Sequence, residues 1–531
     1  MSPVPVSAAG SSVSSTAPVP LSPAASTRLA LASRLRSVAA LIIAPAAVPA
    51  PDPDPAADAA AVLDAVVTAL VADPAADSVW LLLTALSATF PTRDEVQEAR
   101  RRLELDEPLQ AALDLLDAGL ERAQLVGDPL AELDVVIGGV VVDVDHTARF
   151  NLHTGIQRVA RNLMPHWMNH PGLVAAAWTA RGGGLRRLTE RETERVFDWT
   201  ARGGAGEGQQ PGISRTAGEP LPRLVVPWRS VVVMVEVPPA MVSDRVAALG
   251  DHSGNRVVGI GYDAIPVVSA DMVPPVESAK FVRYLTAVKF ARRIAGISAA
   301  ATAELGGFVS MLPTQGLTGP VVTEVSLPAP AMPDRPVSAA PASGTGGPLV
   351  LVVGSHEPRK NHLAVLHAAE ILWREGRAFT LRFIGGSGWG DEFPRRANDL
   401  AETGRPVEIL KAVDDTVLEQ SFSDAAFTLF PSLHEGYGLP VVESLAHGTP
   451  AISSDFGSTA EIALDGGVLT IDPRDDHALT DAMRVLLTDP AVLATLREQI
   501  TRRTGRTWAR YATELWTTLV TPELEDLDAR R

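Results

Sequence analysis

The sequence predicts an α/β protein with two parallel-sheet units that follow a small helical region. Three observations support this prediction. From residue 135 onward, short runs of Val and Ile alternate with stretches of helical periodicity, a pattern typical of buried parallel strands with helical crossovers. A Pro/Gly-rich segment over residues 331–348 divides these runs into two sets. Ahead of both sets, residues 56–130 carry apolar residues at helical spacing.

Length, charge and cysteine content narrow the class of protein. The 531 residues leave room for several domains with sizeable cores. Lys and Arg total 46 against 63 Asp and Glu, so the net charge of -17 offers no basic field for a nucleic acid. The chain has 0 Cys, which excludes a disulfide scaffold and a Cys nucleophile. We therefore expect a cytoplasmic protein without a nucleic-acid partner.

The first 55 residues are rich in Pro, Ala and Ser, and we expect them to be mostly a disordered tail. Within them, Arg28, Arg34 and Arg36 precede the first acidic residue, and Leu31, Leu35, Val38 and Ile42 fall at helical spacing. Residues 28–44 therefore allow peripheral contact with the inner face of a membrane. The alternative is an irregular tail or a helix docked on the next domain.

Residues 56–130 are expected to form a small bundle of three or four helices. Thr92 and Glu95 have capping-box spacing just before one of the helical runs. No residue of this region carries an obvious chemical function, so we assign the bundle to packing or partner contact.

Two sets of strands follow the bundle. We expect an N-terminal domain over residues 131–330, with strands at 135–137, 140–142, 173–178, 231–235, 256–260 and 294–297. After the linker at 331–348, a second domain is expected over residues 349–490, with strands at 349–353, 380–384, 407–410, 427–430, 451–454 and 468–471. Residues 491–531 should form helices that pack back on the N-terminal domain.

The first strand of the second domain is followed by Gly-Ser-His-Glu-Pro-Arg-Lys-Asn, residues 354–361. Arg359 and Lys360 beside the backbone amides of a helix start suit a diphosphate group. A solvated basic turn is the alternative interpretation.

The fourth strand of this domain is followed by a Gly-rich loop and a helix start. Gly436 and Gly438 let backbone approach a ligand, and Pro440 suits the first turn of a helix. Glu435 and Glu443 lie 8 positions apart, so both can face the same end of the sheet. Their spacing does not suit a close acid/base pair, and it favours carboxylates that accept hydrogen bonds from sugar hydroxyls.

The run His-Glu-Gly-Tyr-Gly-Leu-Pro-Val-Val-Glu over residues 434–443, preceded by Glu-Pro-Arg-Lys-Asn, resembles the retaining glycosyltransferases of family 4. The resemblance covers about residues 135–489, and it implies the GT-B fold, in which two Rossmann-like domains face a cleft. In the first domain, residues 143–149, 154–159 and 262–266 are also similar to family segments. The first 130 or so residues lie outside the resemblance.

On the donor side, the resemblance implies a site for a nucleotide-diphosphate sugar, with no cofactor and no metal. Arg359 and Lys360 would neutralise the diphosphate. Glu443 would bind the ribose hydroxyls, and Glu435 the transferred sugar. The remaining donor-binding positions would be backbone ones: Gly155, Gly436, Gly438 and Leu439.

On the acceptor side, the resemblance points to Asp263 or Tyr262, with a strand-end residue that holds a loop as the alternative. Many relatives have His where this chain has Tyr262, and basic residues in the loop that here reads Gly-Gly-Ser-Gly-Trp-Gly at 385–390. The implied activity is metal-independent, retaining transfer of a hexose such as mannose to a glycan or lipid-linked saccharide in polysaccharide biosynthesis. A non-catalytic glycan-assembly subunit and a GT-B sugar-nucleotide epimerase remain alternatives.

Two other motifs were considered. The Gly-rich loop at 385–390 lacks the third glycine of a dinucleotide fingerprint, because Asp391 stands at that position. Asp143-Val-Asp145 has the pattern of a metal-binding Asp-x-Asp, yet it ends the first strand of a two-unit α/β chain. We therefore expect neither a dinucleotide fingerprint at 385–390 nor a metal-binding Asp-x-Asp at 143–145.

Overall fold

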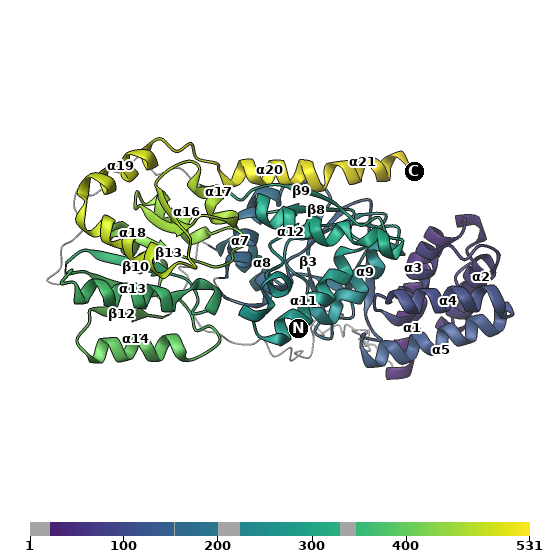
Figure 1. Cartoon of the computed structure of the whole chain (residues 1–531). Helices are drawn as coiled ribbons and strands as arrows, with labels where there is room; N and C mark the ends of the chain where they lie inside the picture. Colours follow the sequence, from purple (N-terminus) through teal and green to yellow (C-terminus); the bar gives the residue numbers. More distant parts are fainter. Residues whose placement is uncertain (1–21, 153, 200–222, 330–346, 412, 531) are drawn as a thin grey trace, which may run out of the picture.

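The computed structural model of the chain describes residues 22–152, 154–199, 223–329, 347–411 and 413–530. Figure 1 shows a helical bundle at one end, a first α/β unit in the middle and a second α/β unit at the other end. Residues 1–21 of the expected tail and residues 331–346 of the expected linker lie outside the described part of the chain. The three folded parts follow the predicted order.

The bundle contains five long helices. Their bounds are α1 (Pro23–Ile42), α2 (Pro55–Ala72), α3 (Ala76–Ser87), α4 (Arg93–Leu105) and α5 (Pro108–Leu125). The predicted capping box is present, because Thr92 and Glu95 exchange side-chain to backbone hydrogen bonds at the start of α4. The bundle core includes Trp80 and Phe90, whose rings lie 5.3 Å apart.

The expectation of a disordered tail to residue 55 is wrong for residues 23–42, which form α1. The Ser22 hydroxyl accepts a hydrogen bond from Ala25, and Pro23 occupies the first turn, so the helix has a regular start. Ala and Leu are strong helix formers, and Leu35 and Val38 are each 1% exposed inside the bundle. The Pro-rich composition that indicated disorder lies on both sides of this helix, and the helix itself has proline only in its first turn.

The structure does not support the membrane contact expected of residues 28–44. The apolar side of α1 faces α2 and α3 and is not available to lipid. Arg34 is 1% exposed and donates hydrogen bonds to the carbonyls of Ala85, Pro129 and Ala131 at 2.7, 2.8 and 3.0 Å. Arg36 pairs with Asp58 on α2. Helix α2 is apolar and long enough to span a membrane by length and composition, but its buried face packs on α1 and α5.

The first α/β unit is built on a sheet of nine strands in the order β1-β5-β4-β3-β2-β6-β7-β8-β9. All neighbours pair in parallel except β4, which is antiparallel to β3 and β5. The strands are β1 (Glu132–Ile137), β2 (Val140–Asp143), β3 (Leu173–Trp178), β4 (Leu185–Arg187), β5 (Arg223–Trp228), β6 (Val231–Met234), β7 (Arg256–Gly261), β8 (Arg293–Gly296) and β9 (Val321–Glu324). Strands β4, β5 and β9 were not expected from the sequence.

Helices cover this sheet, and several of them directly follow one of its strands in the chain. They are α6 (Asp145–Arg149), α7 (Gly155–Trp167), α8 (Glu190–Phe197), α9 (Ser243–Asp251), α10 (Ile265–Val268), α11 (Pro275–Val288) and α12 (Ala299–Ser310). Helix α7 begins with a capping box in which Thr154 and Gln157 bond each other's backbone amides. The start of α7 is thereby fixed near the carboxyl end of β2.

The second α/β unit has a six-stranded, fully parallel sheet in the order β12-β11-β10-β13-β14-β15. All six strands lie where the sequence predicts them: β10 (Leu349–Val353), β11 (Thr380–Ile384), β12 (Val407–Leu410), β13 (Ala425–Phe430), β14 (Ala451–Ser454) and β15 (Val468–Ile471). The helices are α13 (His362–Arg374), α14 (Glu392–Glu402), α15 (Asp415–Asp424), α16 (Leu439–Ala446), α17 (Gly457–Ala463), α18 (Asp476–Thr488) and α19 (Pro490–Thr501). The strand order reverses between β10 and β13, where open α/β sheets bind ligands.

The last two helices join the units. Helices α20 (Trp508–Leu519) and α21 (Thr521–Ala529) run from the second unit back across the first, along the top of Figure 1. The indole of Trp167 on α7 donates to the carbonyl of Ala512 at 3.0 Å, and Arg293 on β8 pairs with Glu523 at 2.8 Å. These contacts hold helices α20 and α21 against the first unit.

Candidate active site

The two loops singled out in the sequence meet at the switch point of the second sheet. One follows β10 and contains the 3-10 turn Pro358–Lys360, and the other follows β13 over residues 431–438. The Leu433 amide donates to the Arg359 carbonyl at 2.7 Å, and the Arg359 guanidinium donates to the His434 carbonyl at 3.0 Å. Because β10 and β13 are neighbouring parallel strands, both loops leave the same edge of the sheet.

Glu435 binds both cations of the first loop. Its carboxylate lies 2.9 Å from the guanidinium of Arg359 and 2.6 Å from Nζ of Lys360, and its side chain is 10% exposed. Burial by itself would raise the pKa of Glu435, but the two cations outweigh burial and hold this pKa at about 2. The glutamate is therefore ionised at neutral pH, and the three groups together keep one positive charge.

The two cations differ in their surroundings. Burial lowers the pKa of Lys360, and Glu435 offsets part of this effect. Burial also acts against the charge of Arg359, but Glu435 and Glu357 outweigh it and raise the pKa of that guanidinium. The Lys360 ammonium lies 4.6 Å from the centre of the Phe430 ring at the end of β13. Both cations are thus fixed in position before any ligand arrives.

Helix α16 begins at Leu439, as the sequence predicted, and its first turn contains Pro440. Gly438 has φ of +116°, a backbone conformation that suits glycine. A Cβ on Gly436 would lie 2.5 Å from the Tyr262 carbonyl of the first unit, so backbone from the two units meets at this residue. In the first turn of α16, Pro440 has no amide hydrogen and the Val441 and Val442 amides donate to the Gly438 carbonyl, so Leu439 carries the helix amide that can serve a ligand.

Glu443 lies one turn into α16 and pairs with Arg158 on α7 of the first unit. Burial raises the pKa of Glu443, and Arg158 acts in the opposite direction. Gly155, the first residue of α7, is close to Leu439, because a Cβ at position 155 would meet the Leu439 side chain at 3.6 Å. The structure thus brings Gly155, Gly436, Gly438, Leu439 and Glu443 to one place between the units.

Tyr262 and Asp263 reach the same place from the end of β7. The Tyr262 side chain is buried, and its hydroxyl donates to the Val235 carbonyl at 2.7 Å, so it holds the loop in position. Asp263 accepts a hydrogen bond from the Ile265 amide at 3.1 Å. Burial raises the pKa of Asp263, against the opposing effect of Arg359. The Asp263 carboxylate lies beside the loop after β13, because a Cβ on Gly436 would be 3.1 Å from Asp263 Oδ2.

Sequence reasoning missed several contacts across the site. The His434 ring forms hydrogen bonds with Ser269 at 2.7 Å and with Glu304 at 2.6 Å, both in the first unit. Glu461 on α17 accepts from the amides of Ala299 and Ala300 at the start of α12, at 2.9 and 2.8 Å. No local pattern marks these residues, since each partner lies more than 100 positions away.

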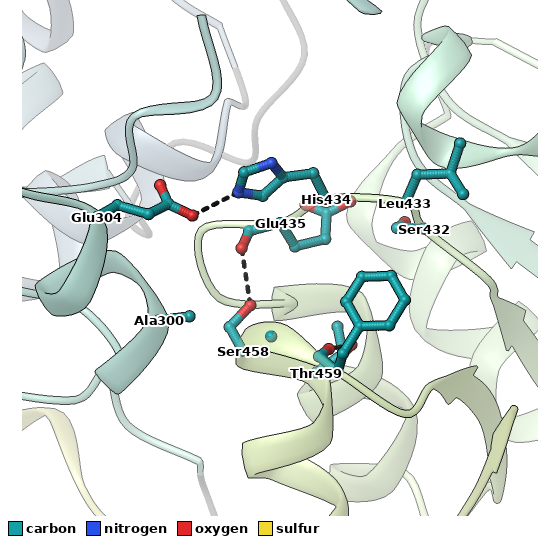
Figure 2. A pocket seen from close by; sticks show the side chains of 10 residues that line it. Ala300, Glu304, Ser432, Leu433, His434, Glu435, Ser458 and Thr459 are labelled. Carbon is teal, nitrogen blue, oxygen red and sulfur yellow. Dashed lines mark hydrogen bonds and ion pairs between the residues drawn. The ribbon is translucent and has the colours of Figure 1, made fainter. Parts of the chain in front are cut away.

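Figure 2 shows the cavity beside Glu435, lined by the loop residues 432–435, by residues 456–459 and by Ala300 and Glu304 of α12. Its volume is about 210 Å³, and it is open on one side. Glu304 and His434 are hydrogen-bonded to each other in its wall, and the Ser458 hydroxyl donates to the Glu435 carbonyl at 2.9 Å. Residues of both units line it, so the cavity lies between them.

The Asp-x-Asp motif is occupied by structural contacts. Asp143 accepts from the indole of Trp178 at 2.8 Å, and burial raises the pKa of Asp143 to about 8. Asp145 pairs with Arg149 at 2.6 Å and accepts from the Trp178 amide at 2.8 Å. Within the described ranges, no cluster of three or more His, Asp or Glu side chains could hold a metal ion.

Comparison with known proteins identifies the second unit. Residues 336–505 match the family model described as "Glycosyl transferases group 1". The chain is 32% identical over 141 residues to "Serotype-specific mannosyltransferase WbdA" of Escherichia coli, covering 26% of this chain and 17% of that protein. It is also 32% identical over 131 residues to "O-antigen chain mannosyltransferase B" of Escherichia coli, covering 24% of this chain and 34% of the relative. The chain therefore spans well under two thirds of the length of these relatives.

Among solved structures, sucrose-phosphate synthase from Thermosynechococcus elongatus is similar at a TM-score of 0.48 and 15% identity, over 74% of this chain and 100% of that one. The arrangement of two α/β units around the Glu435 loop is the predicted GT-B fold, preceded by the helical bundle. The second unit of this chain is thus a glycosyl transferases group 1 domain.

Proposed function

We propose that the chain is a retaining glycosyltransferase of family 4 that transfers a hexose, mannose in the first instance, from a nucleotide-diphosphate sugar to a glycan or lipid-linked saccharide. The observation that carries the proposal is the buried group of Glu435, Arg359 and Lys360 at the switch point, directly before the start of α16. Relatives that are named mannosyltransferases support the choice of sugar. The proposed setting is polysaccharide biosynthesis in the cytoplasm.

In this proposal the donor diphosphate lies between Arg359, Lys360 and the amides of Gly438 and Leu439. Positive charge and helix amides that are already in position stabilise the negative charge that develops on the leaving nucleotide. This arrangement would supply the charge that a metal ion provides in other transferases, so we propose a metal-independent reaction without a cofactor. Glu443 binds the ribose hydroxyls.

Glu435 binds the transferred sugar and keeps the two cations in place. Its carboxylate is ionised and half-enclosed by the cavity, so it accepts hydrogen bonds from sugar hydroxyls and favours an oxocarbenium-like transition state. Asp263 belongs to the acceptor side, because it comes from the first unit and lies beside the loop after β13. Tyr262 serves there by fixing the loop through its bond to Val235.

A thermal-shift panel of GDP, UDP, ADP, dTDP and their monophosphates tests the donor site. A ligand that binds only the folded chain, at about 100 times its dissociation constant, adds roughly 2.7 kcal/mol. We expect one diphosphate to raise the unfolding temperature more than its monophosphate, and Lys360→Ala to abolish this preference. No shift from any nucleotide would contradict the proposal.

A second assay separates transfer from the other GT-B activities. With the matching sugar nucleotide, free nucleoside diphosphate should be released only when a saccharide acceptor is present, and NMR of the product should show the anomeric configuration of the donor. Release without acceptor would favour a sugar-nucleotide epimerase. Loss of rate after removal of divalent metal with EDTA would contradict metal independence.

A further inference from the structure

The ion pair between Arg158 and Glu443 crosses the cleft at the proposed donor site. Arg158 lies in the first turns of α7 in the first unit, and Glu443 lies one turn into α16 in the second. The N-terminal ends of the two helices face each other. Gly155 and Leu439 are the first residues of the two helices, and a Cβ on Gly155 would lie 3.6 Å from the Leu439 side chain. The pair therefore links the two units where the starts of two helices meet.

Glu443 is only partly satisfied by this pair. One carboxylate oxygen pairs with Arg158, while the other, Oε2, is buried without a hydrogen-bond partner among the described residues. A buried carboxylate oxygen without a donor is costly, so its position indicates a ligand that brings a donor group. Ribose hydroxyls have this chemistry.

Arg158 has room to move. Its side chain is 37% exposed and that of Glu443 21%, and ion pairs with this degree of exposure are weak enough to exchange for another partner. Long side chains on a helix lean toward its N-terminus, so the Arg158 guanidinium extends over the first turn of α7 beside Gly155. From there it can reach an anion bound between the two helix starts.

The charge at the site leaves a place for a third cation. Arg359 pairs with Glu357 at 2.8 Å as well as with Glu435, so the two cations of the second unit are already balanced by two carboxylates. A sugar-linked diphosphate is a dianion, so a further cation would favour its binding. Arg158 is the cation that approaches from the opposite unit.

We propose that Arg158 exchanges partners when the donor binds: it holds Glu443 in the free chain, and it moves to the diphosphate when the ribose takes Glu443. This inference rests on the proposed function and deepens it, since it gives the first unit a side chain that senses the diphosphate. Arg158 would thereby contact the donor from the first unit, and its departure would leave Glu443 free for the ribose.

The test is calorimetric titration of the full chain, as wild type, Arg158→Ala and Arg158→Lys, with GDP, UDP, ADP and dTDP and with the matching nucleosides. We expect the diphosphate that binds the wild type to bind Arg158→Ala about tenfold more weakly, the scale of one charge-assisted hydrogen bond. The matching nucleoside should bind Arg158→Ala at least as tightly as the wild type, because Glu443 is then free. Arg158→Lys should recover part of the diphosphate affinity.

Arg374→Ala is a charge-matched control, because Arg374 is 75% exposed on α13 and pairs with Glu370 away from the cleft. It should change neither affinity. Should Arg158→Ala fail to fold, Glu443→Gln tests the same exchange from the other side: it frees Arg158, so it should weaken nucleoside binding and strengthen binding of inorganic pyrophosphate.

Equal weakening of nucleoside and diphosphate by Arg158→Ala would overturn the inference, since a purely structural link affects both alike. Unchanged affinity for both, or unchanged pyrophosphate binding in Glu443→Gln, would also overturn it while the proposed function stands. A wild-type chain that binds none of the diphosphates overturns the proposed function, and this inference with it.

Discussion

Glu435→Gln tests the electrostatics of the site most directly, because it removes the charge and keeps the shape of the side chain. The pKa of Glu435 is held at about 2, compared with its ordinary value of 4.5. This difference of about 2.5 corresponds to about 3 kcal/mol of folding stability at about 1.36 kcal/mol per pKa unit. At neutral pH the variant should lose stability of this order.

The sign of the pH dependence follows from the direction of the pKa change. A carboxylate whose pKa is lowered on folding stabilises the folded chain above its unfolded pKa, and this stabilisation disappears as the pH falls toward the folded value. The deficit of Glu435→Gln should therefore be full at pH 7 and should shrink below about pH 4.5.

Thermal unfolding of wild type and variant between pH 3.5 and pH 7 provides the measurement. For a unit of this size, about 3 kcal/mol corresponds to a shift of roughly 6–12 °C in the transition of the second unit. Glu419→Gln is the matched control, since Glu419 is exposed on α15. Equal unfolding temperatures at pH 7, or a deficit that is the same at pH 4 and pH 7, would refute the reasoning.

Three further predictions concern contacts between the parts of the chain. Gly436→Ala should lower the unfolding temperature and reduce nucleotide binding, because the new Cβ would lie 2.5 Å from the Tyr262 carbonyl. Gly306→Ala on α12 is the control: its Cβ would meet nothing within 4 Å, so it should be neutral or stabilising. Equal behaviour of the two variants would contradict this prediction. His434→Gln should cost most stability at acid pH, because Glu304 raises the pKa of His434. The stabilisation by the charged histidine is full below the ordinary pKa of 6.5 and disappears as the pH rises through the pKa of the folded chain. A loss of stability that does not depend on pH in thermal unfolding would argue against a charged histidine. Arg34→Met should destabilise the bundle by about 3 kcal/mol, because the carbonyls of Ala85, Pro129 and Ala131 lose their donor. Limited proteolysis of residues 22–130 should become faster, and nucleotide affinity should stay unchanged. Weaker nucleotide binding would show instead that the bundle acts on the cleft.

Local pattern predicted the strands of the second sheet. All six were placed, because short apolar runs separated by helical stretches are typical of parallel strands, and this held even for β12 and β15, which are only partly buried. Strand β5 was missed: Pro227 interrupts its run, and its pairing with β1 depends on residues 91 positions away. The helical spacing within α1 was recognised, but composition averaged over 55 residues indicated a mostly disordered tail, and a helix docked on the next domain was only an alternative; the packing on α2 and α3 decided for this helix.

At the site, the sequence alone was enough to select the two loops and, within them, Arg359, Lys360, Glu435 and Gly438. Each loop follows a strand of a parallel sheet, and the backbone conformation that a loop needs is visible in its own residues. Which of these groups touch was decided by the tertiary structure. Arg158 meets Glu443, and His434 meets Ser269 and Glu304, only because the two units are packed face to face. Ion pairs and hydrogen bonds form over a few ångströms in space, and neither hydrophobic periodicity nor loop composition specifies which distant segments come that close.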